Sequence, residues 1–148
     1  MTQMNLIDRL DSELLKLHVN IATRFQNQTA NAKALEAGSY ALSAPFFAYS
    51  GQGLGDIELF TYGMAVLVGY NAIAAIKNYR HTSDFFLDKA SSRGIDVAGY
   101  GLGLAALGIG IIEQFNPETE LSMKTASLGL GFIAFSAGEY FHRAKNRL

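Results

Sequence analysis

Two side chains near the C-terminus have the spacing of metal ligands on one face of a helix. Glu139 and His142 lie three positions apart, so a helix places the carboxylate and the imidazole on neighbouring turns. Di-iron bundles use this Glu-x-x-His pattern, but they need two such pairs and two further carboxylates from facing helices. This chain contains one pair, and His81 with Asp84 and Asp88 forms a second possible ligand group. We predict no metal and no cofactor, with Glu139 and His142 as the candidate ligands should this be wrong.

Carboxylates also occur within or beside long apolar segments. Glu36, Asp96 and Glu139 each lie in such a segment, and Asn71 lies deeper in another. An ionisable group inside a membrane segment is a functional candidate by default. All three carboxylates, however, fall within about two turns of one predicted end of their helices, where water or bases such as Arg143 can reach them. We therefore expect solvated or salt-bridged helix ends, rather than a proton or cation site.

Other catalytic motifs are absent. The glycine-rich run at 51–55 lacks the Lys-Ser or Lys-Thr that follows in a phosphate loop, so it is expected to be a turn. No serine lies in a Gly-x-Ser-x-Gly elbow. The chain has no cysteine, which excludes a thiol nucleophile and a disulfide framework. We predict that the protein is not an enzyme.

The distribution of positive charge predicts the elements that must position these residues. Eleven of the 12 Lys and Arg residues fall in three blocks, and the apolar segments between the blocks are paired across short loops at 51–58 and 113–120 that contain no base. Basic loops are retained on the cytoplasmic side of a membrane. Both termini and the middle loop are therefore predicted inside. The blocks are Arg9, Lys16, Arg24 and Lys33; Lys77, Arg80, Lys89 and Arg93; and Arg143, Lys145 and Arg147.

Four apolar segments have about the 20 residues that a bilayer requires. They lie near 34–53, 58–77, 95–114 and 122–142, and the second and third carry charges only at their ends. The predicted fold is all-α, a four-helix transmembrane bundle of two hairpins (33–148) preceded by an amphipathic cytoplasmic helix (1–32). The alternative is a soluble bundle with apolar core helices. The 15 glycines argue against it, because glycine costs about 1 kcal/mol in an aqueous helix and is common in membrane helices.

The amphipathic helix has an apolar stripe at alternating three- and four-residue steps. Three interpretations remain open: the stripe lies on the membrane surface, pairs with a partner or second copy, or packs on the cytoplasmic ends of the spans. Its mixed-charge polar face favours contact with protein. His18 falls on the polar side and is expected to be solvated. The stripe comprises Ile7, Leu10, Leu14, Leu17 and Ile21.

Small residues form smooth faces on the third and fourth predicted spans. In lipid, such faces let helix backbones approach closely. The third span has two of them, so it is predicted to be the central helix; the contacts lie either within one chain or in an oligomer or partner interface. The stripes are Gly94, Ala98, Gly101, Ala105 and Gly108; Gly99, Gly103, Ala106 and Gly110; and, in the fourth span, Ser127, Gly131, Ala134 and Gly138.

These features predict a multi-pass protein of a bacterial inner membrane, with both termini cytoplasmic. Its predicted role is that of a non-enzymatic structural or assembly subunit, whose partners are the lipid bilayer and other membrane subunits or copies of itself. A nucleic-acid partner is excluded because the bases are spread over three short flanks. An oligomeric, holin-like pore or small transporter is the first alternative, and a metal-dependent membrane enzyme or redox subunit is the second.

Overall fold

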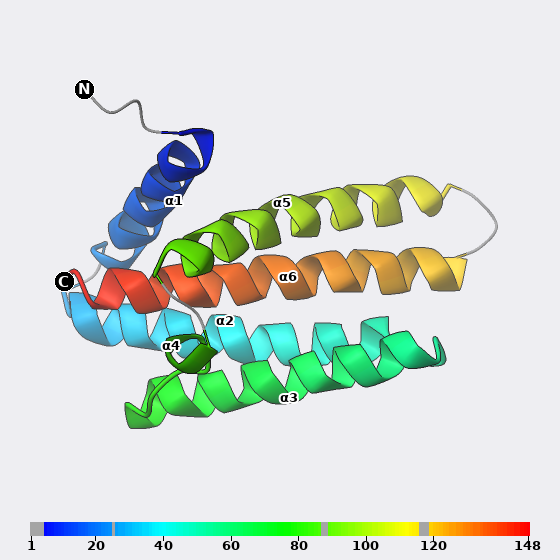
Figure 1. Ribbon diagram of the computed structural model, residues 1–148, viewed down its shortest axis with the longest axis horizontal. Helices are drawn as coiled ribbons and strands as arrows, with labels where there is room; N and C mark the ends of the chain where they lie inside the picture. The colour runs from blue at the N-terminus through cyan, green and yellow to red at the C-terminus, as the bar shows by residue number, and fades with distance from the viewer. Residues whose placement is uncertain (1–4, 25, 87–88, 116–118) are drawn as a thin grey trace.

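The computed structural model is all-α and describes residues 5–24, 26–86, 89–115 and 119–148, in which no strand occurs. Within these described ranges, five long helices and one short one follow each other along the chain (Figure 1). They are α1 (Leu6–Ala22), α2 (Gln28–Ser50), α3 (Asp56–Lys77), α4 (Ser83–Phe86), α5 (Lys89–Glu113) and α6 (Thr119–Lys145).

Helices α5, α6, α2 and α3 lie one beside the next in that order (Figure 1). Thus α3 packs on α2, α2 packs on α6, and α6 packs on α5, while α1 crosses the end of the bundle that holds the C-terminus. The turn between α2 and α3 lies at the other end, and Gly53 and Gly55 adopt positive φ angles of 72° and 60° there. The prediction that the glycine-rich run at 51–55 is a turn is confirmed.

The central helix of the described bundle is α6, so the prediction that the third span is central is wrong. Helix α6 contacts α1, α2 and α5. Its small residues serve two neighbours at once: a Cβ on Gly138 would lie 2.7 Å from the Tyr40 ring of α2, and one on Gly129 would lie 2.5 Å from the Leu107 backbone of α5. Glycine in α6 therefore permits close packing on two sides of this helix.

The two small-residue stripes of α5 have different surroundings. A Cβ on Gly103 would lie 2.7 Å from Ile133 of α6, and one on Gly110 would lie 2.6 Å from the backbone of Ala126. By contrast, a Cβ on Gly94, Gly101 or Gly108 would meet none of the described residues within 4 Å. One stripe of α5 is thus packed on α6, and the other is bare.

Two of the four predicted spans meet a length and hydropathy test for membrane crossing among the described residues. They are α3 (Asp56–Lys77) and the segment Ser91–Glu113 of α5. Of the 18-residue apolar stretch of each helix, only 33% is buried in α3 and 22% in α5. These helices therefore turn most of their apolar side chains outward, and the four-span prediction is supported in part.

Helix α1 packs on α5 and α6 through a face that looks polar in sequence. Its first turn is capped by Asn5, whose Oδ1 accepts a hydrogen bond of 2.9 Å from the backbone N–H of Asp8. The buried residues are Asp11, Leu15, His18 and Ala22. The prediction that His18 is solvated is wrong, because only 4% of this residue is exposed. Most of the predicted apolar stripe stays outside.

Candidate functional site

Two buried polar clusters occupy the end of the bundle where α1 and the C-terminus meet. The histidine cluster consists of Glu36, His81 and His142, with Lys145 at its edge. The arginine cluster consists of Arg143, Asp11, Asp96 and Tyr140. Both draw on the last turns of α6, so adjacent residues of one helix serve different clusters.

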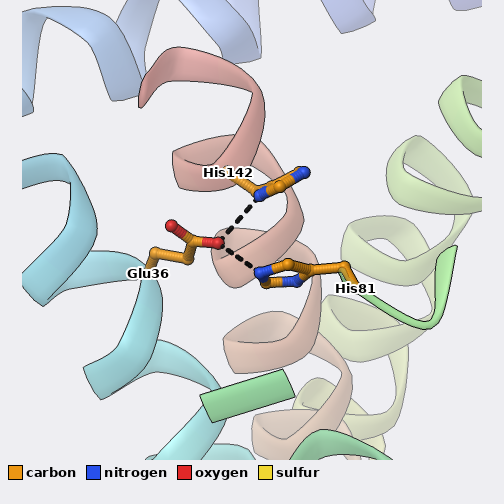
Figure 2. A group of neighbouring side chains, drawn as sticks. All are labelled: Glu36, His81 and His142. Atoms are coloured by element: carbon orange, nitrogen blue, oxygen red, sulfur yellow. Dashed lines mark hydrogen bonds and ion pairs between the residues drawn. The ribbon is translucent and has the colours of Figure 1, made fainter. Parts of the chain in front are cut away.

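The histidine cluster brings together three segments that are distant in sequence. Glu36 comes from α2, His142 from α6, and His81 from the loop after α3 (Figure 2). Oε1 of Glu36 lies 2.8 Å from Nε2 of His81 and 2.8 Å from Nδ1 of His142. Its second oxygen, Oε2, accepts a hydrogen bond of 2.7 Å from the ammonium of Lys145. Glu36 is fully buried and His81 is 1% exposed.

The end of α3 explains how His81 enters the bundle. Asn78 terminates the helix in a left-handed conformation, with φ 56° and ψ 36°. Asparagine tolerates this conformation better than most residues do. The buried side chain of Asn71 then accepts hydrogen bonds from the backbone N–H of Thr82 at 3.0 Å and from its hydroxyl at 3.1 Å. These two bonds fold the loop back along α3, which turns His81 inward.

The ring of His81 makes no well-formed hydrogen bond. Among the described residues neither Nδ1 nor Nε2 has a partner of acceptable geometry, although Nε2 is close to the Glu36 carboxylate. The rings of His81 and His142 lie against each other, with centroids 4.0 Å apart and planes inclined by 32°. An unsatisfied buried polar group costs about 1–3 kcal/mol. The cluster therefore lacks a partner for at least one imidazole nitrogen.

The arginine cluster fastens α1 to the bundle. Arg143 donates to both carboxylate oxygens of Asp11, at 2.6 and 2.7 Å, and to Asp96 of α5 at 3.2 Å. The hydroxyl of Tyr140 donates to Asp11 at 2.9 Å. Burial alone would raise the pKa of Asp11, but the hydrogen bonds from Arg143 and Tyr140 outweigh it and hold this pKa below its usual value of 3.8. The expectation of a salt-bridged helix end is confirmed for Asp96, which pairs with Arg143, and for Glu36, which pairs with Lys145. It is wrong for Glu139, which is 3% exposed and accepts a hydrogen bond from Tyr40.

His18 makes a second link between α1 and the bundle. Its Nδ1 donates to the backbone carbonyl of Leu14 at 2.7 Å, which leaves Nε2 to accept from the hydroxyl of Tyr100 at 2.8 Å. Its ring stacks on that of Tyr140 with centroids 5.0 Å apart. Burial lowers the pKa of His18 below 6.5, against the opposing effect of the carbonyl. This imidazole is therefore neutral and fully paired, unlike His81.

The candidate ligands from the sequence take separate roles in the structure. Glu139 accepts a hydrogen bond of 2.7 Å from Tyr40, whereas His142 contacts Glu36 and His81. Oδ2 of Asp84 lies 3.9 Å from Nε2 of His142. The other residue of that predicted group, at position 88, lies outside the described residues. Sequence reasoning missed the pairing of Glu36 with two histidines, because no local spacing links these three segments.

Two cavities flank this region. A cavity of about 320 Å³ is lined by polar side chains that include Asp84, Glu139 and His142. A second cavity, of about 420 Å³, is almost entirely apolar and lies between α3, α5 and α6, next to Met64, Leu102 and Phe132. Ser83 and Glu139 line both.

Comparison with known protein families, with curated proteins and with solved structures finds no match.

Proposed function

We propose that this chain is a small multi-pass membrane protein that acts as a non-enzymatic assembly subunit. In this proposal α2, α3, α5 and α6 cross the bilayer, and α1 with the two polar clusters lies at the cytoplasmic face. The observation that carries the proposal is the bare small-residue stripe of α5, beside a matching stripe that is packed on α6.

The outward faces of α3 and α5 support the membrane location. Large apolar side chains at least half exposed recur along both helices, and burying them in lipid removes their contact with water. The cytoplasmic orientation rests on the bases that gather at the end of the bundle with the C-terminus. The exposed side chains are Ile57, Leu59, Phe60, Val66, Ile73 and Ile76 on α3, and Leu102, Leu104, Ile109, Ile111 and Ile112 on α5.

Helices α2 and α6 are less apolar than α3 and α5, and an acidic residue of each is paired inside the bundle. Glu36 of α2 is held by Lys145 of α6, and Glu139 of α6 is held by Tyr40 of α2. Polar groups inside a membrane protein are tolerated when they face the bundle interior and pair with one another. These two central helices therefore suit a membrane interior when α3 and α5 flank them.

The bare stripe of α5 is suited to a second membrane helix. Gly94, Gly101 and Gly108 recur every seven residues, and Ala98 and Ala105 between them are exposed. Association of helices in lipid depends on close van der Waals contact, which residues of this size permit. A partner helix could approach this face as closely as α6 approaches the other.

The exposed stripe of α1 offers a second contact on the same partner. Leu10 and Leu17 are 46% and 52% exposed, and Leu6 and Ile7 extend the surface toward the N-terminus. The arginine cluster holds α1 in place, so the stripe has a defined direction relative to α5. An assembly subunit with these two surfaces would bind its partner both in the membrane and at the cytoplasmic face.

Site-specific photo-crosslinking in native membranes tests the proposal. A photoreactive residue at position 101 lies on the bare stripe, and one at Leu104 lies on the same helix at an exposed position off the stripe. The proposal predicts a discrete protein adduct from position 101, either with a second copy or with another subunit, and mainly lipid adducts from position 104. Lipid adducts alone from both positions would contradict it.

A further inference from the structure

We infer that the histidine cluster is a binding site for a divalent transition-metal ion, with Nε2 of His81, Nδ1 of His142 and Oε1 of Glu36 as its protein ligands. This inference goes beyond the assembly function and does not rest on it. One ligand atom from each of the three residues lies within 4.8 Å of the others. Figure 2 shows both imidazoles turned toward the same carboxylate oxygen.

The ligand types indicate the class of ion. Two imidazoles and one carboxylate form the protein ligand set of several zinc sites and of non-haem iron sites, in which further coordination positions stay open. Mg²⁺ and Ca²⁺ prefer oxygen ligands and would leave the imidazoles unused. The site therefore suits Zn²⁺ or another first-row transition ion, rather than a hard cation.

The ring of His81 is the second observation that points to a ligand. It is 1% exposed and is held inward by the Asn71 hydrogen bonds to Thr82. Among the described residues its Nδ1 has no partner, and its Nε2 has only the Glu36 carboxylate, 2.8 Å away but outside good hydrogen-bond geometry. His18 shows what a purely structural buried histidine looks like in the same chain, because both of its nitrogens are paired. An ion that accepts the lone pair of Nε2 would satisfy His81 at the side facing Glu36.

The surrounding residues fit the role of outer partners. Oδ2 of Asp84 lies 3.9 Å from Nε2 of His142, the nitrogen that stays available when Nδ1 binds the ion. Metal-bound histidines commonly direct their second nitrogen at such a carboxylate. Lys145 binds Oε2 of Glu36 and leaves Oε1 facing the imidazoles. Its positive charge opposes that of the ion, so replacing it with methionine should retain or tighten binding.

The polar cavity reaches one of the three proposed ligands. His142 lines it, together with two carboxylates, Asp84 and Glu139, and three arginines, Arg93, Arg143 and Arg147. An ion bound by the histidine cluster would join α2, the loop after α3 and α6 at one point. Its binding should therefore stabilise the contact between the two hairpins.

Cobalt binding to the full-length protein tests the inference. The protein is purified in detergent with a tag free of histidine, stripped with EDTA, and titrated with Co²⁺, whose visible absorption reports the ligand set. We expect saturation at one Co²⁺ per chain, displacement by Zn²⁺ but not by excess Mg²⁺, and a higher thermal midpoint with Zn²⁺. Absence of saturable binding by the wild-type protein, or displacement by Mg²⁺, would overturn the inference.

Matched variants locate the site. His81→Gln and Glu36→Gln should weaken Co²⁺ binding by at least about tenfold, since each removes a ligand. His18→Gln removes the one histidine outside the cluster, and Glu139→Gln removes a nearby carboxylate that binds Tyr40, so both should bind Co²⁺ like the wild type. Circular dichroism confirms the fold of each variant. Equal binding by folded His81→Gln and His18→Gln would refute the assignment. If a ligand variant does not fold, the titration of the wild-type protein decides whether the inference holds.

Discussion

Helices α1 and α5 differ in what they turn inward, yet they agree in what they leave outside. Helix α1 packs on the bundle with Asp11 and His18, and α5 packs on α6 with glycines. Each also has a face turned outward: Ile7, Leu10 and Leu17 of the α1 stripe are exposed, and a Cβ on Gly94, Gly101 or Gly108 of α5 would meet none of the described residues within 4 Å. Packing within the chain therefore explains the inward face of each helix. The outward faces are the basis of the proposed assembly role.

The largest difference between the two faces of α5 is expected when a glycine of each face is replaced by leucine. Gly103→Leu should prevent the α5–α6 contact, because even a Cβ there lies 2.7 Å from Ile133 and 2.8 Å from the carbonyl oxygen of Gly129. Gly101→Leu should leave the bundle folded and remove only assembly. Thermal unfolding in detergent and native-membrane crosslinking separate the two effects. Loss of fold in both variants, or in neither, would show that the two faces are equivalent.

The inward face of α1 is tested next by removing its ionic link. Arg143→Met leaves Asp11 and Asp96 buried without their partner, which typically costs about 3–5 kcal/mol. We expect α1 to detach, and protease cleavage after Lys16 to accelerate. Lys16→Met removes the exposed pair with Glu13 and should cost at most about 1 kcal/mol. For these two variants the readout is the free energy of unfolding, and equal losses would contradict the docked position of α1.

A pair of leucines compares the two faces of α1 directly. Leu15→Asp buries a charge at a position that is 2% exposed, so α1 should detach and unfolding should become easier by roughly 2–5 kcal/mol. Leu10→Asp changes a position that is 46% exposed, and it should keep α1 docked while weakening partner binding. Hydrogen exchange of α1 amides distinguishes the two. Detachment of α1 in the Leu10 variant would place its apolar stripe in the core.

The smallest expected effect is a pH dependence of α1 docking. Burial lowers the pKa of His18, so its contribution to stability is complete above pH 6.5 and is lost as the pH falls through the lower folded value. Ala22 is a fully buried position of α1, and a cysteine placed there should react faster with a thiol reagent as the pH falls below 6.5. Each rate is first corrected for the fraction of thiolate present at that pH. The same cysteine in a His18→Gln background should lose this acceleration. An unchanged profile would remove His18 from the account of docking.

Local patterns in the sequence predict the helices well. The predicted spans overlap α2, α3, α5 and α6, and the glycine-rich run forms the first turn as expected. Periodicity and charge act within single helices, so a single sequence contains the information for them. The small-residue stripes were also visible, because they too have helical spacing.

Contacts between distant segments explain the rest of the differences. The burial of His18 and Asp11 depends on partners far along the chain: Tyr100 is 82 positions from His18, and Arg143 is 132 positions from Asp11. The histidine cluster joins three separate segments, so the local Glu139 and His142 spacing did not reveal Glu36 or His81 as the neighbours of His142. Whether α5 or α6 is central depends on which stripes face each other, and no local pattern determines that.

Accessibility of two single cysteines tests the membrane arrangement most directly, since the natural chain has none. Asp56→Cys lies at the first residue of α3 and Asn146→Cys lies just after α6, both at exposed positions at opposite ends of the bundle. A membrane-impermeant maleimide added to intact cells should label position 56 and should reach position 146 only after lysis. Labelling of both positions from the same side would contradict a bundle that spans the membrane with its C-terminus inside.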